Sequence, residues 1–144
     1  MSLRKLQRPD LDALLDLYTH LHAADEPLAP RERVLEVWEQ LLASTGLSCL
    51  GLELDGLLVA SCTLCITPNL TRGTRPYAQI ENVVTRSEYR RRGLGKTIIQ
   101  AALAQAWSAG CYKVMLMTGR RDAHAFYEQC GFRSDAKTGF VAYP

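Results

Sequence analysis

The sequence predicts one domain, residues 1–144, that combines helices and strands in an α/β or α+β fold. One observation is the change of hydrophobic spacing along the chain, from helical periodicity to short continuous apolar runs and back. The other is composition, because 47% hydrophobic and 22% charged residues are the proportions of a globular domain. No apolar run is long enough to cross a membrane, so we expect no membrane partner.

The first half of the chain is expected to form two helices and a hairpin. Pro9 and Asp10 start a helix over residues 10–22, and a second helix ends near Ser44. The apolar positions of these helices are Leu11, Leu14, Leu15, Tyr18 and Leu21, followed by Val34, Trp38, Leu41 and Leu42. Two strands then flank Asp55-Gly56, a pair that is typical of a tight hairpin turn.

The second half continues with alternating strands and helices. The expected elements are a strand over residues 78–85, a helix over 94–110, a strand over 113–118, a helix over 123–130 and a last strand over 140–143. Gly110 and Gly131 are placed to end the two helices, because glycine readily adopts the left-handed conformation that follows a helix. Asp122 can cap the start of the shorter helix.

The five cysteines lie mostly inside apolar segments, and their number is odd. Cys62 and Cys65 form a C-x-x-C within an expected strand, and no second Cys or His pair completes a zinc site. We therefore expect reduced thiols and no metal. The amino terminus lacks the apolar stretch and cleavage site of a secretory signal, which predicts a cytoplasmic protein.

Residues 90–97, RRRGLGKT, concentrate positive charge in a chain whose net charge is only +2. A Walker A loop would need glycine where Arg90 stands, and a dinucleotide fingerprint would need glycine at Ile98. The segment instead joins an expected strand to an expected helix, whose free first-turn amides can bind an anion. This favours a pyrophosphate over a triphosphate with magnesium, and a solvated basic turn is the alternative.

Two segments then carry a family resemblance. Residues 87–96, SEYRRRGLGK, resemble motif A of the GCN5-related N-acetyltransferases (GNAT family), R/Q-x-x-G-x-G/A, with Arg90, Gly93 and Gly95 at its key positions. Residues 123–132, AHAFYEQCGF, resemble the second signature of that family, A-x-x-F-Y-E-x-x-G-F. The runs QIENVVT and GCYKVML are similar to the glucosamine-phosphate N-acetyltransferase branch. The resemblance implies a mixed central sheet of about six or seven strands, splayed in the middle and flanked by about four helices.

The resemblance also implies that acetyl-coenzyme A (acetyl-CoA) binds between the strand at 78–85 and the strand at 113–118. The backbone of Val83, Val84 and Thr85 would then pair with its pantetheine arm like an added strand. The other expected cofactor-binding residues are Arg90, Arg91, Arg92, Gly93, Leu94, Gly95, Lys96, Thr97 and Arg120. Arg120 stands where the family often has Asn, and it can reach a cofactor phosphate, reach an anionic substrate or simply face solvent.

By the same resemblance, Tyr127 holds the family position of the acid that protonates the leaving thiolate, and packing beside Phe126 is the alternative. Glu81 is the candidate base or water relay for the amine, and an ion pair with an arginine is its alternative. His20, His22 and His124 are further candidates for this role. The residues expected at the acceptor are Asp25, Glu26 and Asn82, although the first two also suit an ordinary charged loop.

These observations predict an enzyme that transfers the acetyl group of acetyl-CoA directly to a primary amine of a small molecule. An acetyltransferase for protein or peptide amines and a non-catalytic acetyl-CoA sensor stay open, and Tyr127 and Glu81 favour the enzyme over the sensor. A nucleic-acid partner is disfavoured because no aromatic stacking platform accompanies the arginines. A homodimer is left open.

Overall fold

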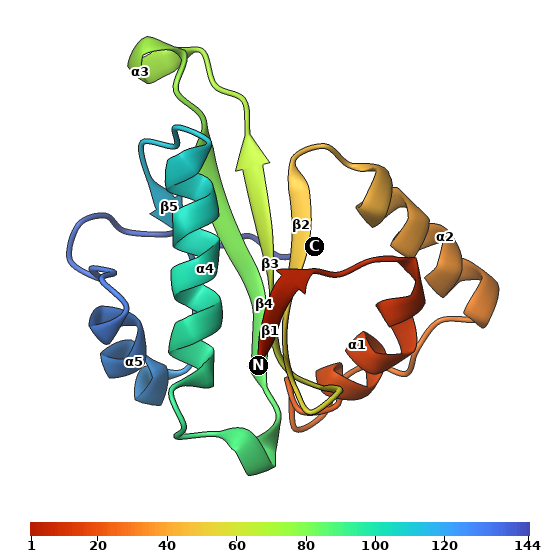
Figure 1. Cartoon of the computed structure of the whole chain (residues 1–144). Coiled ribbons are helices and arrows are strands. Elements are labelled where there is room, and N and C mark those ends of the chain that lie inside the picture. Colours follow the sequence, from red (N-terminus) through yellow and green to blue (C-terminus); the bar gives the residue numbers. More distant parts are fainter.

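The computed structural model describes residues 1–144, and a mixed five-stranded sheet forms its centre (Figure 1). The strands follow the order β1 (Ser2–Lys5), β2 (Leu47–Leu54), β3 (Leu57–Thr67), β4 (Tyr77–Thr85) and β5 (Val114–Met115). Strands β1 to β4 are antiparallel, whereas β5 runs parallel to β4. This confirms the mixed α/β class, with fewer strands than expected.

The helices cover both faces of the sheet (Figure 1). Helices α1 (Leu11–Tyr18) and α2 (Arg31–Ala43) pack on one face, and α4 (Leu94–Ser108) and α5 (His124–Gln129) lie on the other. The short α3 (Thr71–Thr74) projects at the end of the long β3 and β4 strands. Three 3-10 turns complete the fold: η1 (Arg8–Asp10), η2 (Ser87–Tyr89) and η3 (Arg121–Ala123).

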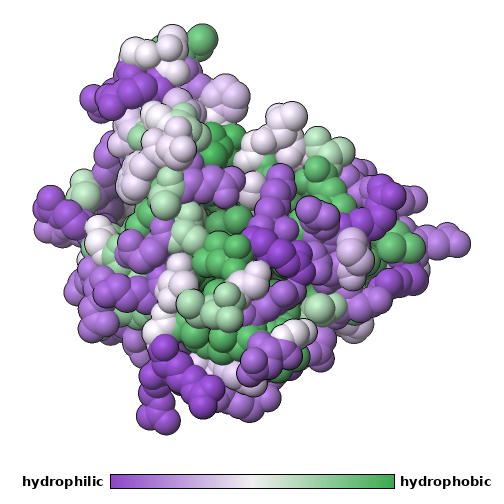
Figure 2. Space-filling view, viewed as in Figure 1, coloured by the Kyte–Doolittle hydropathy of each residue, from purple (hydrophilic) through white to green (hydrophobic).

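Two hydrophobic cores result, one on each face of the sheet. On one face Leu14, Leu17 and Trp38 pack with side chains from the sheet, and on the other Ile98 and Ile99 of α4 do so. Residues 58–62 of β3 are all buried, because both faces of this strand are covered, and this explains its continuous apolar sequence. The face shown in Figure 2 carries hydrophilic atoms over most of its area, with hydrophobic surface gathered near its middle.

The hairpin and the glycines that end two helices confirm the turn chemistry expected from the sequence. Asp55 and Gly56 have φ of 50° and 79°, as a tight turn between two antiparallel strands requires. Gly110, at φ 82°, follows α4 and donates its N–H to the Trp107 carbonyl at 3.0 Å. The next N–H, of Cys111, bonds the Ala106 carbonyl at 3.1 Å, which completes a Schellman motif. Asp122 was wrongly expected to cap α5, because its carboxylate accepts hydrogen bonds from the Arg120 side chain instead.

Two expectations about strands were wrong, and one strand was missed. Residues 140–143 form no strand, because they have no pairing partner and Phe140 and Tyr143 face solvent. Strand β5 pairs with β4 at only Val114 and Met115 instead of over residues 113–118. Strand β1 was missed, because it is short and three of its four residues are exposed, so no hydrophobic alternation reveals it.

A β-bulge interrupts β4 near its middle. Ser61 pairs with Val84 and Thr63 with Glu81, so Asn82 and Val83 together oppose the single residue between them on β3. Asn82 adopts φ of 51° here. Since β5 pairs with β4 only at residues 78 and 79, the rest of β4 has no strand partner on that side. Beyond residue 79, the backbone N–H and C=O groups on this side of β4 therefore have no partner strand.

None of the helices has both the length and the apolar character required to cross a membrane.

Candidate active site

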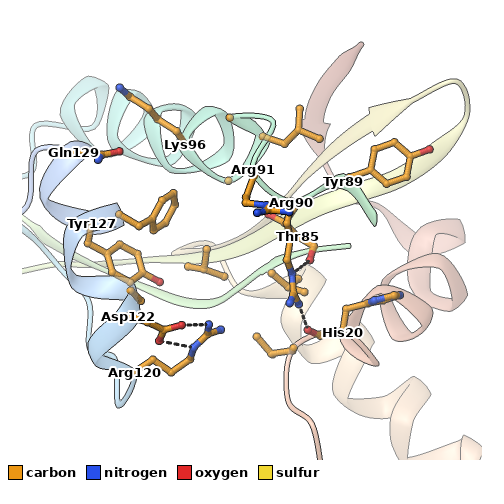
Figure 3. Close-up of a pocket in the computed structure, with 18 residues that line it drawn as sticks. His20, Thr85, Tyr89, Arg90, Arg91, Lys96, Arg120, Asp122, Tyr127 and Gln129 are labelled. Carbon is orange, nitrogen blue, oxygen red and sulfur yellow. Dashed lines mark hydrogen bonds and ion pairs between the residues drawn. The ribbon is translucent and has the colours of Figure 1, made fainter. Parts of the chain in front are cut away.

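Two adjoining cavities lie beside β4. The first lies between the end of β4, the start of α4 and helix α5 (Figure 3), and the second lies between residues 80–83 of β4 and residues 116–120. The first has a volume of about 490 Å³ and the second about 390 Å³. The first is lined by His20, Leu21, Val83, Val84, Thr85, Tyr89, Arg90, Arg91, Gly93, Leu94, Gly95, Lys96, Arg120, Asp122, Ala123, Phe126, Tyr127 and Gln129. The residues shared with the second cavity are Leu21, Val83, Arg120, Ala123 and Tyr127.

The start of α4 offers unpaired backbone donors to the first cavity. Gly93 precedes the helix at φ 79°, a left-handed conformation that favours glycine. The first bond of the helix runs from the Thr97 N–H to the Gly93 carbonyl at 3.0 Å, and no side chain caps this end. The amides of residues 94–96 are therefore available to an anion at the positive end of the helix dipole.

Gly95 has a different role from Gly93. A Cβ atom at Gly95 would lie 3.2 Å from Phe126 Cζ and 3.3 Å from Thr85 Oγ1. Glycine therefore allows helix α4 to approach both β4 and α5 closely. Gly95, Thr85 and Phe126 all line the first cavity.

The basic residues of the 90–97 segment divide into two groups. Arg91 and Lys96 line the cavity, and neither forms an ion pair. Arg90 also lines it, but its Nε donates to the Thr85 carbonyl at 3.1 Å and its Nη2 to the His20 carbonyl at 2.7 Å. Arg92 lies outside the cavity, with its guanidinium 5.2 Å from the centre of the Tyr89 ring.

Through these two hydrogen bonds, Arg90 connects the loop after α1 to the end of β4 (Figure 3). A second arginine also connects α1 to the end of β4, because Arg86 donates to Asp16 Oδ2 at 2.6 Å. That hydrogen bond lowers the pKa of Asp16. Thr97, which was also expected to bind cofactor, lies outside the cavity and donates its hydroxyl to the Gly93 carbonyl at 3.1 Å.

Tyr127 lines both cavities and is held from two directions. Gly131, at φ 97°, donates to the Glu128 carbonyl at 3.0 Å, and Phe132 donates to the Tyr127 carbonyl at 3.1 Å, which forms a Schellman motif. The Tyr127 ring packs edge to face against Phe126 and Phe132, with centroids 5.0 and 6.2 Å away. Burial raises the pKa of Tyr127, so its phenol stays protonated at neutral pH and can donate a proton.

The other expected catalytic residue, Glu81, lines the second cavity together with Asn82. Its carboxylate Oε1 accepts a hydrogen bond from Gln79 Nε2 at 3.2 Å, and no arginine pairs with it. The bulge at Asn82 explains why both side chains are exposed although they are neighbours on a strand. The second cavity therefore presents a carboxylate that has no cationic partner, and Tyr127 lines the same cavity.

The two acidic residues of the loop between α1 and α2 do not line either cavity. Glu26 lines a separate apolar groove of about 290 Å³ between α1 and α2, and Asp25 lines none of these cavities. The histidines are also separated, because His20 lines the first cavity, His22 lines the second and His124 lines neither.

Sequence reasoning missed several residues of the two cavities. They include Leu21, Tyr89, Thr118, Asp122 and Gln129. Leu21 and Thr118 come from connecting segments that carry no motif, so only the folded chain brings them to the site.

None of the five cysteines lines either cavity. Burial raises the pKa of the Cys62 thiol to about 12, and it also raises the pKa values of Cys49, Cys111 and Cys130. Nowhere do three or more His, Cys, Asp or Glu side chains gather in a way that could hold a metal ion.

Comparison with known proteins places the chain among acetyltransferases. The model of the Acetyltransferase (GNAT) family matches residues 11–132. A putative acetyltransferase from Agrobacterium tumefaciens has a solved structure that superposes with a TM-score of 0.93, at 46% identity, with complete coverage of both chains. A Trypanosoma brucei acetyltransferase structure gives a TM-score of 0.81 at 33% identity and covers 99% of each chain.

A further relative carries a more specific name. The glucosamine 6-phosphate N-acetyltransferase of Trypanosoma brucei brucei is 36% identical over 136 residues, which are 93% of this chain and 90% of that protein. The family match spans both expected signatures, the strand-to-helix junction at Gly93 and the helix of Tyr127. The chain thus belongs to the GNAT acetyltransferase family and is an acyltransferase.

Proposed function

We propose that this acetyltransferase transfers the acetyl group of acetyl-CoA to the amine of a small amino sugar phosphate, glucosamine 6-phosphate. The observation that carries the proposal is the position of Tyr127 on both cavities. One cavity offers a binding site for anions, the other offers a free carboxylate, and a proton donor stands between them. The name and 36% identity of the trypanosomal relative support the choice of acceptor.

The first cavity fits the cofactor. The pyrophosphate would meet the free amides of residues 94–96, with Arg91 and Lys96 supplying charge-assisted hydrogen bonds. The pantetheine amides would pair with the backbone of Val83, Val84 and Thr85, where β4 has no neighbouring strand. Acetyl-CoA supplies the activated acetyl group as a thioester.

The second cavity would hold the acceptor with its amine directed toward Tyr127. The amine nitrogen attacks the thioester carbonyl, its C–N bond forms, and the C–S bond breaks as the thiolate leaves. An alkyl amine is protonated at neutral pH, so Glu81 would accept its proton, directly or through water. Tyr127 would give its proton to the departing thiolate, and the second proton that the nitrogen loses as the amide forms would restore the phenol.

Acetyl transfer is tested by incubating the protein with acetyl-CoA and one amine at a time, and by following both coenzyme A release and the acetylated product by mass spectrometry. We expect turnover with glucosamine 6-phosphate and little with the lysine side chain of a peptide. Turnover of the peptide amine alone would replace the proposed acceptor class. Binding of acetyl-CoA with no turnover of any amine would favour a sensor.

A further inference from the structure

We propose that Arg120 recognises the anionic group of the acceptor and so determines specificity for phosphorylated over neutral amino sugars. This proposal rests on the proposed function. Arg120 precedes the 3-10 turn before α5, and its side chain lines both cavities. Among the residues of the second cavity it alone carries a permanent positive charge, because the other ionisable groups there are Glu81, His22 and the Tyr127 phenol.

The position of Arg120 argues against a role at the cofactor phosphates. The unpaired cations Arg91 and Lys96 belong to the start of α4, whereas Arg120 lies on the α5 side with Tyr127 (Figure 3). Acetyl-CoA carries its negative charges on its phosphates, and its pantetheine arm and thioester are neutral. At the reacting end of the cofactor, therefore, Arg120 has no anion of the cofactor to bind.

The local structure holds Arg120 ready for such a contact. Its backbone N–H donates to Thr118 Oγ1 at 3.1 Å, and Thr118 also lines the second cavity. Its Nε and Nη2 donate to the two carboxylate oxygens of Asp122, at 3.2 and 2.7 Å. These two contacts use two of the five N–H donors of the guanidinium, so three remain for a ligand.

Asp122 does not remove this capacity. The side chains of Arg120 and Asp122 are 67% and 70% exposed, and ion pairs as exposed as this contribute little free energy. An incoming phosphate can therefore share the guanidinium or displace the carboxylate. The second cavity then carries a carboxylate for the amine and a guanidinium for the anion, which matches a compact acceptor that bears both groups.

The test compares wild type with two variants, Arg120→Ala and the matched control Arg121→Ala. Arg121 is adjacent in the sequence but lines neither cavity. The acceptors are glucosamine 6-phosphate and glucosamine. In Arg120→Ala we expect kcat/KM for glucosamine 6-phosphate to fall about tenfold or more, as the loss of a charge-assisted contact predicts. The values for glucosamine and the KM for acetyl-CoA should change less than about twofold, and Arg121→Ala should resemble wild type.

An equal loss with both acceptors, or a raised KM for acetyl-CoA in Arg120→Ala, would overturn the role assigned to Arg120. Calorimetric titration of glucosamine 6-phosphate into the protein saturated with coenzyme A separates the two proposals. Binding that Arg120→Ala does not weaken would refute the inference and leave the proposed function intact. A wild-type protein that neither binds nor acetylates this sugar phosphate would refute both.

Discussion

Phe132 donates its backbone N–H to the Tyr127 carbonyl at 3.1 Å, and the rings of these two residues pack edge to face with centroids 6.2 Å apart. The same residue thus terminates helix α5 and supports the side chain that stands between the two cavities. A Schellman motif commonly joins such a backbone bond to an apolar contact. Here that contact fixes the position of the proposed acid.

Replacement of Tyr127 by Phe should remove the acid and keep the packing. We expect kcat to fall by about 10²- to 10⁴-fold, which is the usual contribution of a positioned proton donor. The melting temperature and the affinity for acetyl-CoA should stay close to those of wild type. Tyr143→Phe is the matched control, because Tyr143 is exposed and outside both cavities. An unchanged kcat in Tyr127→Phe would show that the phenol transfers no proton.

Gly131→Ala should weaken the end of helix α5. At φ 97° an alanine is strained, which costs about 1–2 kcal/mol of the free energy of unfolding. We also expect kcat to fall, because the motif that positions Tyr127 is distorted. Urea unfolding and steady-state kinetics measure the two effects. Gly139→Ala is the control, since its Cβ would make only ordinary contacts with Met117, and equal stability of the two variants would contradict this account.

Initial-rate kinetics should show a ternary complex without a covalent acetyl-enzyme. None of the five cysteines lines either cavity, and burial raises the pKa of the Cys62 thiol to about 12. We therefore expect intersecting double-reciprocal plots when both substrates are varied, and Cys62→Ala should keep that pattern. Parallel lines, or an acetylated cysteine found by mass spectrometry, would disprove direct transfer.

The ion pair of Arg4 and Asp10 should make stability depend on pH in the acid range. Two hydrogen bonds, of 2.7 and 2.8 Å, join the guanidinium of Arg4 to the carboxylate of Asp10 and lower the pKa of Asp10. The folded-state pKa lies below the unfolded value near 3.9, so this stabilisation is present above about pH 4 and is lost as the pH falls through the folded value.

Asp10→Asn should therefore reduce the free energy of unfolding by about 1–2 kcal/mol at pH 7. The difference from wild type should shrink as the pH falls below about 4, because wild type then loses the same charge. Chemical unfolding at several pH values measures this. Asp135→Asn, at an exposed pair with Arg133, should have no measurable effect. A difference that stays constant down to pH 2 would rule out the charge as its cause.

Short motifs predicted the strand-to-helix junction at residues 90–97, because the junction depends on local backbone geometry. Gly93 and Gly95 could be assigned to a strand-to-helix junction from the sequence, and the structure gives them a left-handed φ and a close approach to Phe126. Side-chain partners depend on distant segments and could not be predicted in this way. Arg90, for example, uses its Nε and Nη2 on the carbonyls of Thr85 and His20, whereas Arg91 extends into the cavity.

The details of strand pairing also could not be predicted from the sequence. The bulge at Asn82 interrupts the regular alternation of side chains between the two faces of β4. No residue in the run QIENVVT indicates this bulge in advance. The bulge places Glu81 and Asn82 together at the second cavity. In the same way, Asp25 and Glu26 were expected at the acceptor because of their charge and their place in the loop between the first two helices. Neither residue lines a cavity of the site, although His20, Leu21 and His22 of the same loop do.

In the proposed complex, the first cavity binds acetyl-CoA with its pyrophosphate at the start of α4. Isothermal titration of acetyl-CoA into wild type, Arg91→Ala and Arg92→Ala tests it most directly. Arg91 lines the cavity, whereas Arg92 stacks on Tyr89 outside it, so the two variants remove the same charge from adjacent positions. We predict clear binding by wild type, a Kd raised about tenfold in Arg91→Ala and a much smaller change in Arg92→Ala. No binding by folded wild type, or equal losses in both variants, would contradict the claim.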